Sequence, residues 1–289
     1  MRALGIDVGV GKGLDLVLLD DSRVPFVVVP HAGLDDVERV VREGSPSIVA
    51  IDGPPRWARD GRSRATENEL ARLNVHAFRT PSEPHGTAAA FDWMRRGMEV
   101  FAAVERLGFP LATGRPWKGR AIEVFPHATA AVLAGCLSPK GLRKRAWRER
   151  VLRLAGVRTQ ELTSLDQIDA ALAALTGLLV LQGQASALGD PSEGVIVIPT
   201  NAPSPKYRPG VLAAEDPGSQ LFAWCACGAC QRQIPAGSEF ARGHDAKRKS
   251  LLWQRVREGR DAQEELRRRR WEMPPETCLL YTSDAADEL

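Results

Sequence analysis

The sequence lacks the features that mark several common classes of protein. No segment has about 18 consecutive apolar residues, so a membrane-spanning helix is not expected. The N-terminus has no basic stretch followed by an apolar one, as a signal peptide would, and we expect a cytoplasmic protein. A P-loop, a GxGxxG motif and internal repeats are also missing. The sequence therefore gives no support for a membrane protein, a secreted protein or the common nucleotide-binding motifs.

Cysteine is scarce and unevenly placed. The chain has five cysteines, of which Cys136 and Cys278 stand alone, whereas Cys225, Cys227 and Cys230 fall within six residues. An odd number in a compartment that is expected to be reducing argues against a disulfide framework. The group of three is instead a candidate metal site.

The overall composition is that of an ordinary globular protein, with 44% hydrophobic and 26% charged residues in 289. We expect one large domain over residues 1–199, a proline-rich linker over 200–219 and a small C-terminal module over 220–272. Residues 278–289, CLLYTSDAADEL, resemble a translated sequencing adapter and are expected to be an artefact. The formal net charge of +3 is compatible with a polyanionic partner but does not identify one.

The first 30 residues predict three short strands. Apolar runs over Ala3–Gly9, Leu14–Leu19 and Val24–Val29 are separated by polar or glycine-containing gaps, as in an antiparallel meander. The first run carries one charge, Asp7, between Ile6 and Val8. A charge buried in a strand is costly unless a partner or a ligand compensates it, so Asp7 is a functional candidate.

A helix and a fourth strand follow the meander. Gly33–Glu43 has the apolar spacing of an amphipathic helix, and Ser47–Asp52 has the composition of a buried strand. This order predicts a mixed α/β sheet in which the fourth strand lies beside the first. If those two strands are parallel, Asp7 and Asp52 meet at one edge of the sheet, where α/β proteins bind ligands.

The rest of the large domain alternates between helices and short strands. We expect helices near Arg64–Leu73 and over Ala88–Leu107, Leu142–Leu154 and Asp166–Leu181, with strands at Ala121–Phe125 and Val195–Ile198. Glu123 is placed in the middle of its strand, and Asp166 and Asp169 share one face of the first turn of their helix. An Asp at a strand end also has a simpler explanation as a turn or cap residue, and Asp166 has one as a first-turn acid favoured by the helix dipole. Glu123, in mid-strand, faces either solvent or the site.

Carboxylates from separate segments suit one kind of chemistry. Mg²⁺ and Mn²⁺ prefer hard oxygen ligands, and two such ions about 4 Å apart activate water and stabilise the leaving oxygen in phosphodiester hydrolysis. We expect Asp7 to bridge two ions, Asp52 and Asp169 to complete their coordination, and Glu123 to be a ligand or a base that orients water.

Four short motifs, GIDVG, AIDGPP, EVFPHAT and the DxxDAALAAL helix, resemble those of the family called domain of unknown function 429. The resemblance covers residues 1–199 and implies a ribonuclease H-like fold and a predicted nuclease. It implies an active site drawn from Asp7, Asp52, Glu123 and Asp169, with Asp166 as an additional acid. In the segment RATENEL, Glu67 resembles the family's acid in that region.

The C-terminal module carries a second candidate metal site. Cys225, Cys227, Cys230 and His244 supply the three thiolates and one imidazole of a closed tetrahedral zinc site, and FARGHDAK resembles a recurrent GHDAK-type knuckle segment. Such a site would be structural. The alternative is a loop with three free thiols.

Two basic segments each have two interpretations. Residues 247–260 and the helix over Leu142–Leu154 are rich in Lys and Arg, and these side chains either contact phosphates or form a solvated helix face. We expect the helix residue Trp147 to be buried in the core.

Together these patterns predict a nuclease dependent on Mg²⁺ or Mn²⁺, with DNA or RNA as partner. Two alternatives stay open: a nucleic-acid-binding or adaptor protein with an inactive core, and an enzyme acting on a phosphorylated small molecule.

Overall fold

The first three strands form the antiparallel meander that the sequence predicts. In the computed structural model, β1 (Arg2–Val8) pairs with β2 (Leu14–Asp20), which in turn pairs with β3 (Pro25–Ala32). The model describes residues 1–9, 11–83, 88–210, 222–224 and 233–235. It divides into two units, Met1–Ala214 and Glu215–Leu289.

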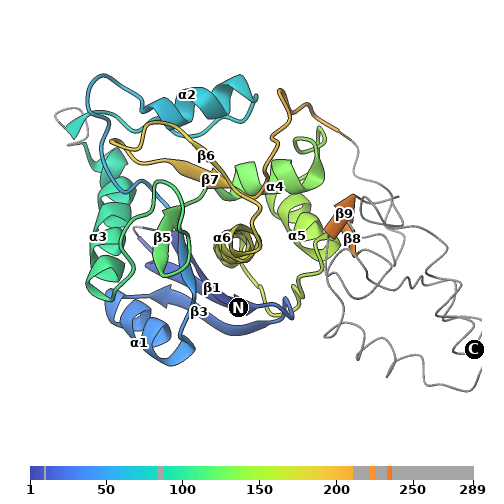
Figure 1. The fold of residues 1–289 in the computed structure, drawn as a ribbon, viewed down its shortest axis with the longest axis horizontal. Coiled ribbons are helices and arrows are strands. Elements are labelled where there is room, and N and C mark those ends of the chain that lie inside the picture. Colours follow the sequence, from blue (N-terminus) through green and yellow to red (C-terminus); the bar gives the residue numbers. More distant parts are fainter. Residues whose placement is uncertain (10, 84–87, 211–221, 225–232, 236–289) are drawn as a thin grey trace, which may run out of the picture. The chain divides into compact units, whose positions relative to one another are not determined.

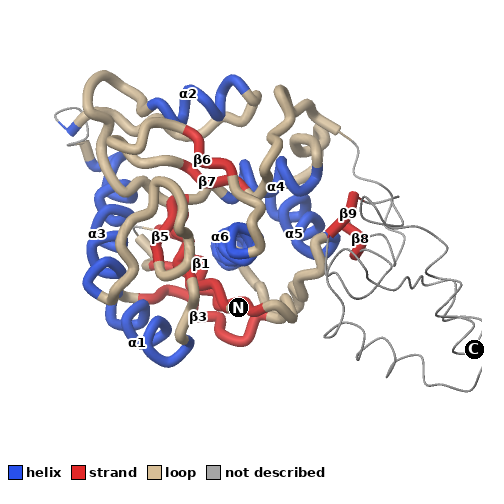
Figure 2. The backbone as a smooth tube through the Cα atoms, in the orientation of Figure 1, coloured by secondary structure: helices blue, strands red, loops and turns tan. Residues whose placement is uncertain are grey.

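The rest of the large sheet adds parallel strands and one antiparallel edge strand. β4 (Ile48–Asp52) pairs in parallel with β1, and β5 (Arg120–Glu123) pairs in parallel with β4. β7 (Ile196–Ile198) continues in parallel, and β6 (Ser186–Leu188) closes the edge in the antiparallel direction. The strand order is β3-β2-β1-β4-β5-β7-β6. Figure 2 shows the strands in red and the helices in blue. The ribonuclease H-like mixed sheet expected from the sequence is confirmed.

Helices cover both faces of this sheet (Figure 1). On one face, α1 (Leu34–Gly44) and α3 (Asp92–Arg106) pack on the strands and on each other. On the other face, α6 (Leu165–Leu181) packs on β1, β2 and β4. The helices α4 (Pro126–Ala134) and α5 (Lys144–Leu154) contact α6, and α2 (Ala65–Arg72) contacts β6.

Small residues bring α6 very close to the sheet. A Cβ atom on Gly5 of β1 would lie 1.9 Å from the carbonyl oxygen of Ala170, so only glycine fits there. About two turns further along α6, a Cβ on Gly177 would lie 3.0 Å from the Cβ of Ala3. Because side chains alternate along a strand, Leu4 and Ile6 face the α1 and α3 side, where they join that core cluster. The alternation therefore places Asp7 on the α6 side, with Ala3 and Gly5.

Several expected elements have other boundaries. The strand expected at Ala121–Phe125 ends at Glu123, so this acid lies at a strand end rather than in the middle. Pro126 then begins α4, a helix that was not predicted. Proline suits the first position of a helix, and α4 is apolar on most sides, so it lacks the amphipathic period that would have revealed it. The helix expected from Ala88 starts at Asp92, after a 3₁₀ turn over Ala89–Phe91.

The second unit is described only at two short strands. β8 (Phe222–Trp224) pairs antiparallel with β9 (Gln233–Pro235). Within the described residues of the whole chain, no helix has the length and apolar character needed to span a membrane.

Candidate metal centre and its cavity

The sheet brings Asp7 and Asp52 together at one edge. The two residues are direct partners in the parallel register of β1 and β4, and each is the last or next-to-last residue of its strand. Both belong to the set of alternate positions that faces α6, as the contacts of Ala3, Ile48 and Ala50 with Gly177 show. Their carboxylates therefore leave the sheet on the same face and at the same level.

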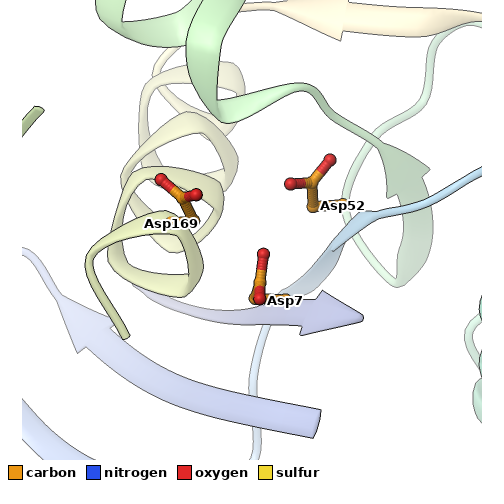
Figure 3. A group of neighbouring side chains, drawn as sticks. All are labelled: Asp7, Asp52 and Asp169. Atoms are coloured by element: carbon orange, nitrogen blue, oxygen red, sulfur yellow. The ribbon is translucent and has the colours of Figure 1, made fainter. Parts of the chain in front are cut away.

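The third acid of this group comes from the beginning of α6. Ser164 caps this helix, because its Oγ accepts a hydrogen bond from the backbone nitrogen of Gln167 at 3.0 Å. Asp169 follows within the next turn and is buried. Asp7, Asp52 and Asp169 each offer one carboxylate oxygen, and these oxygens lie within 4.8 Å of one another (Figure 3). The close packing of α6 on β1 is what allows so short a side chain to reach the sheet edge.

The electrostatics of the three acids are those of crowded like charges. Burial, followed by repulsion from Asp52 and Asp169, raises the pKa of Asp7 to about 9. Burial and repulsion from Asp169 raise the pKa of Asp52 to about 7, although Arg148 and Lys144 act in the opposite direction. Burial also raises the pKa of Asp169. A cation among the carboxylates would favour their charged forms and reverse these shifts.

Asp169 has one oxygen occupied and one free. Arg148 of α5 donates from Nη1 to Oδ2, and Lys144 places its Nζ 3.7 Å from the same oxygen. The other oxygen, Oδ1, is buried and has no hydrogen-bond partner in the described part of the chain. Buried polar atoms are nearly always satisfied, so an unpaired carboxylate oxygen beside two further carboxylates fits a cation ligand.

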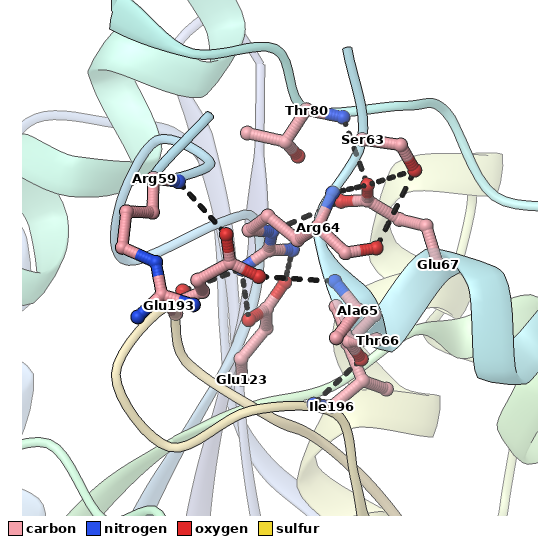
Figure 4. A network of polar contacts seen from close by, with 10 residues as sticks. All are labelled: Arg59, Ser63, Arg64, Ala65, Thr66, Glu67, Thr80, Glu123, Glu193 and Ile196. Carbon is pink, nitrogen blue, oxygen red and sulfur yellow. Dashed lines mark hydrogen bonds and ion pairs between the residues drawn. The ribbon is translucent and has the colours of Figure 1, made fainter. Parts of the chain in front are cut away.

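Glu123 does not join this group, because a buried arginine holds it. Arg64 donates from Nη2 to Oε1 at 2.6 Å and from Nη1 to Oε2 at 2.9 Å, and both side chains are buried (Figure 4). Burial still raises the pKa of Glu123, while Arg64 lowers it. With both oxygens engaged, Glu123 is a poor candidate for a metal ligand in this conformation, contrary to the role expected from the sequence.

Glu67 belongs to the same buried network and serves the fold. Its Oε2 accepts from the backbone nitrogens of Arg64 at 2.8 Å and Thr80 at 3.1 Å and from Ser63 Oγ at 3.0 Å, and Oε1 accepts from Arg64 Nε at 3.0 Å. These contacts cap α2 and fix the irregular chain on either side of it. Glu193 adds a third carboxylate that accepts from the backbone of Arg59 at 2.8 Å and Ala65 at 3.0 Å.

Two more acids surround the group of three without entering it. The side chain of Asp166 is 39% exposed and lies 4.0 Å from Lys12 Nζ. Asp15 of β2 is buried and is the register partner of Asp7 on its other side. Burial and repulsion from Asp166 raise the pKa of Asp15. Both acids add negative potential around Asp7.

The carboxylates line a cavity of about 400 Å³. Cationic residues and apolar ones share its wall with the acids. The cations are Arg64, Lys144 and Arg148, and the larger apolar side chains are Val8, Phe78, Trp93, Phe125, Leu165 and Ile196. Space of this size suits a small ligand or one unit of a polymer.

Sequence reasoning missed the cationic half of this site. Arg64 precedes Glu67 by three residues, the spacing of a capping box, and that spacing was the available signal. Arg148 was noted only as one of several basic residues on its helix, whereas it is buried against Asp169. Trp147, one residue earlier, is buried in the core as expected. The proposed zinc ligands Cys225, Cys227, Cys230 and His244, and the basic residues 247–260, lie outside the described residues.

The mixed sheet, with three antiparallel strands followed by parallel ones and with helices on both faces, has a ribonuclease H-like fold. Residues 5–193 match the family described as "Protein of unknown function (DUF429)", so the chain belongs to that family. No curated protein matches the chain.

The chain is similar to two solved structures. One is "T. thermophilus RuvC in complex with Holliday junction substrate", at 16% identity and a TM-score of 0.37, covering 63% of this chain and 96% of that one. The other is "Thermus thermophilus RuvC structure", at 14% identity and a TM-score of 0.35, covering 63% and 97%.

Proposed function

We propose that this protein is a nuclease that hydrolyses phosphodiester bonds with a divalent cation, Mg²⁺ or Mn²⁺, held by Asp7, Asp52 and Asp169. The observation that carries the proposal is the convergence of three carboxylate oxygens within 4.8 Å in a cavity, one acid having a buried oxygen with no partner. Hard oxygen ligands without sulfur or imidazole are the donor set that these ions prefer.

The reaction is a balanced hydrolysis. Water adds to the phosphorus, the bond from phosphorus to one ester oxygen breaks, and a proton passes to that oxygen, leaving a phosphomonoester and a hydroxyl group. A cation bound by the three acids supplies positive charge at the phosphate and lowers the pKa of water. Asp7 lies between Asp52 and Asp15 in the sheet, and its carboxylate is the candidate to accept the proton that water loses.

The two cationic residues of α5 at the site, Arg148 and Lys144, have different roles in this proposal. Arg148 keeps Asp169 charged and oriented, because it pairs with Oδ2 and leaves the buried Oδ1 without a hydrogen-bond partner in the described part of the chain. Lys144 is 56% exposed at the cavity wall, with its Nζ 3.7 Å from Asp169 Oδ2, and its charge would also attract the phosphate of an incoming substrate. The basic face of α5 is thus divided between a buried positioning residue and an exposed phosphate contact.

The sequence predicts a mechanism with two ions. A second ion would have fewer acids available than the first, which uses Asp7, Asp52 and Asp169. Glu123 would have to leave Arg64, which holds both of its oxygens. Asp166 and Asp15 are the remaining acids near Asp7. The number of ions per chain is therefore a property to measure, and one tightly bound ion is the arrangement that these contacts favour.

The test is cleavage of single-stranded and duplex DNA and RNA by the purified full-length chain. We expect cleavage with Mn²⁺ or Mg²⁺, none with chelator, and a loss of at least about 10²-fold in Asp7→Asn and Asp52→Asn. Asp60→Asn is the matched control, because Asp60 is an exposed acid outside the cavity. No cleavage of any nucleic acid by the wild-type chain would contradict the proposal.

A second candidate is hydrolysis of a phosphorylated small molecule, which the cavity volume of about 400 Å³ also accommodates. Release of phosphate from nucleotides or sugar phosphates, without cleavage of polymers, would favour it. Binding of nucleic acid without any cleavage would instead favour the adaptor alternative.

We also propose that Cys225, Cys227, Cys230 and His244 hold a structural zinc ion in a small module that follows the linker. The residue types and the expected reducing compartment support this. Metal analysis of the purified chain should give one zinc per chain, and Cys227→Ser should lose it. Zinc content equal in both proteins would contradict the assignment.

A further inference from the structure

One aromatic side chain at the metal cavity is left in water. Phe78 is 80% exposed, the largest exposed fraction among the large hydrophobic residues of the described chain. Burial of a phenylalanine stabilises a fold, and this residue forgoes most of that gain. An exposed phenylalanine alone needs no explanation, so its surroundings decide whether it has a use.

The position of Phe78 sets it apart from the other exposed apolar residues. Met1, Phe26 and Leu142 are also exposed, but among these four only Phe78 lines the cavity that contains the three acids. Phe26 has a contact of its own, with the guanidinium of Arg2 5.1 Å from its ring centroid. Phe78 therefore presents an apolar ring to the same space in which the carboxylates and Lys144 face a substrate.

The geometry of its aromatic neighbour leaves ring surface available. Phe78 and Trp93 of α3 have centroids 6.0 Å apart and ring planes at 65°, an edge-to-face arrangement. In an edge-to-face pair at most one face of each ring meets its partner, so another flat ring can stack on the remaining face of Phe78, which is 80% exposed. Trp93 also lines the cavity and braces Phe78 from the side.

The chemistry of the cavity identifies the ring that belongs there. Acids that bind a cation, with Lys144 and Arg148 beside them, recognise a phosphate, and an aromatic platform in the same cavity recognises a flat base. A space of about 400 Å³ can hold one nucleotide. A base inside a duplex has both faces covered by its neighbours and cannot stack on Phe78. The base must therefore be unpaired, as in a single strand or a flipped nucleotide.

We propose that Phe78, supported by Trp93, is a stacking subsite for an unpaired base next to the phosphate at Asp7, Asp52 and Asp169. The assignment rests on the proposed nuclease function and narrows its substrate to nucleic acid with unstacked bases. The DNA and RNA forms of such a strand share this chemistry, and the test includes both.

The experiment measures binding separately from cleavage. The probes are a short oligothymidylate and a short oligouridylate, each with one 2-aminopurine and with phosphorothioate linkages that resist cleavage, titrated into the full-length chain with Mg²⁺. Stacking should quench the 2-aminopurine fluorescence. Loss of one base stack corresponds to about 1–3 kcal/mol, so Phe78→Ala should weaken binding roughly 5- to 150-fold, whereas Phe78→Trp should retain it.

The matched control is Phe26→Ala, which removes an exposed aromatic outside the cavity and should bind as the wild type does. The same probes annealed into a blunt duplex should bind more weakly and be insensitive to Phe78→Ala. In cleavage assays of unmodified strands, Phe78→Ala should raise KM more than it lowers kcat.

Three results would overturn the subsite: no binding of either probe, equal binding by wild type and Phe78→Ala, or an equal loss in Phe26→Ala. Cleavage by the wild type that Phe78→Ala leaves unchanged would remove the subsite and keep the nuclease. Binding that depends on Phe78 in a chain that cleaves nothing would keep the subsite and remove the nuclease.

Discussion

Asp7 and Asp52 are direct register partners on two parallel strands, so two carboxylates leave the sheet side by side on one face. Burial and mutual repulsion raise the pKa of Asp7 to about 9 and that of Asp52 to about 7. Without a cation, the pair therefore keeps protons at a pH where ordinary aspartates have lost them. The site is costly in its metal-free form and is suited to a positive ion.

The first prediction concerns the stability of the metal-free protein. The folded-state pKa of Asp7, about 9, lies above its ordinary value of 3.8, so between these limits the folded chain binds more protons than the unfolded chain. The free energy of unfolding should therefore fall as pH rises through this window. Asp7→Asn removes the charge, and at the alkaline end it should raise that free energy by about 1 kcal/mol or more.

Urea unfolding in the presence of chelator measures this effect. Asp60→Asn, a change at an exposed loop acid, should leave both the stability and its pH dependence unchanged. An Asp7→Asn protein that is less stable than the wild type at alkaline pH would show that the carboxylate is not under repulsion.

The second prediction concerns the pH dependence of metal binding. A cation needs charged carboxylates, so its binding must displace the protons held by Asp7 and Asp52. The affinity for Mg²⁺ or Mn²⁺ should rise with pH up to about 9, the raised pKa of Asp7, and binding should release protons. Calorimetric titrations in buffers of different ionisation enthalpy count those protons, and zero protons released near neutral pH would contradict the assignment of these pKa shifts.

The third prediction concerns Arg148, which is buried against Asp169. Arg148→Met leaves that carboxylate without its buried cation and should lower the free energy of unfolding by about 3–5 kcal/mol without metal. A bound divalent cation would replace the lost charge, so metal should stabilise this variant more than the wild type.

Thermal unfolding with and without Mn²⁺ distinguishes these states. Arg145→Met changes an exposed arginine of the same helix and should behave as the wild type. If metal raises the Tm of Arg148→Met no more than that of the wild type, Arg148 and the cation do not share Asp169.

The fourth prediction concerns the second buried arginine. Arg64 is the ion-pair partner of both Glu67 and Glu123, and all three are buried. Arg64→Met should lower the free energy of unfolding by about 3–5 kcal/mol, because it leaves two buried acids unpaired. The double variant Arg64→Met with Glu123→Gln should recover part of the loss. Arg59→Met is the control, since the side chain of Arg59 is 69% exposed. Equal losses of stability in Arg64→Met and Arg59→Met would contradict this account.

The sequence predicted the antiparallel first three strands, the fourth strand beside the first, and the meeting of Asp7 with Asp52, because these follow from local patterns; it did not predict β6. Apolar runs with short turns define the strands, and acids at the ends of parallel neighbours share an edge. The position of Asp169 near the beginning of its helix was also predictable, since it closely follows the capping signal of a long apolar helix.

The sequence did not predict which acids pair with buried arginines and which gather in the group of three. Glu123 and Asp52 are both the last residues of apolar strands, yet Arg64 holds Glu123, whereas Asp52 belongs to the group of three acids. That difference depends on residues 59 positions apart in the sequence, which no local period reports. The helix α4 was missed for a related reason, because a buried apolar helix has no amphipathic face.

The most direct test of the central claim is anomalous diffraction from a crystal of the full-length chain soaked in Mn²⁺. We predict a peak bounded by Asp7, Asp52 and Asp169, about 2.0–2.3 Å from one oxygen of each, with Arg148 still paired to Asp169. A crystal that binds Mn²⁺ elsewhere, and leaves these three carboxylates without an ion at concentrations that support activity, would contradict the account.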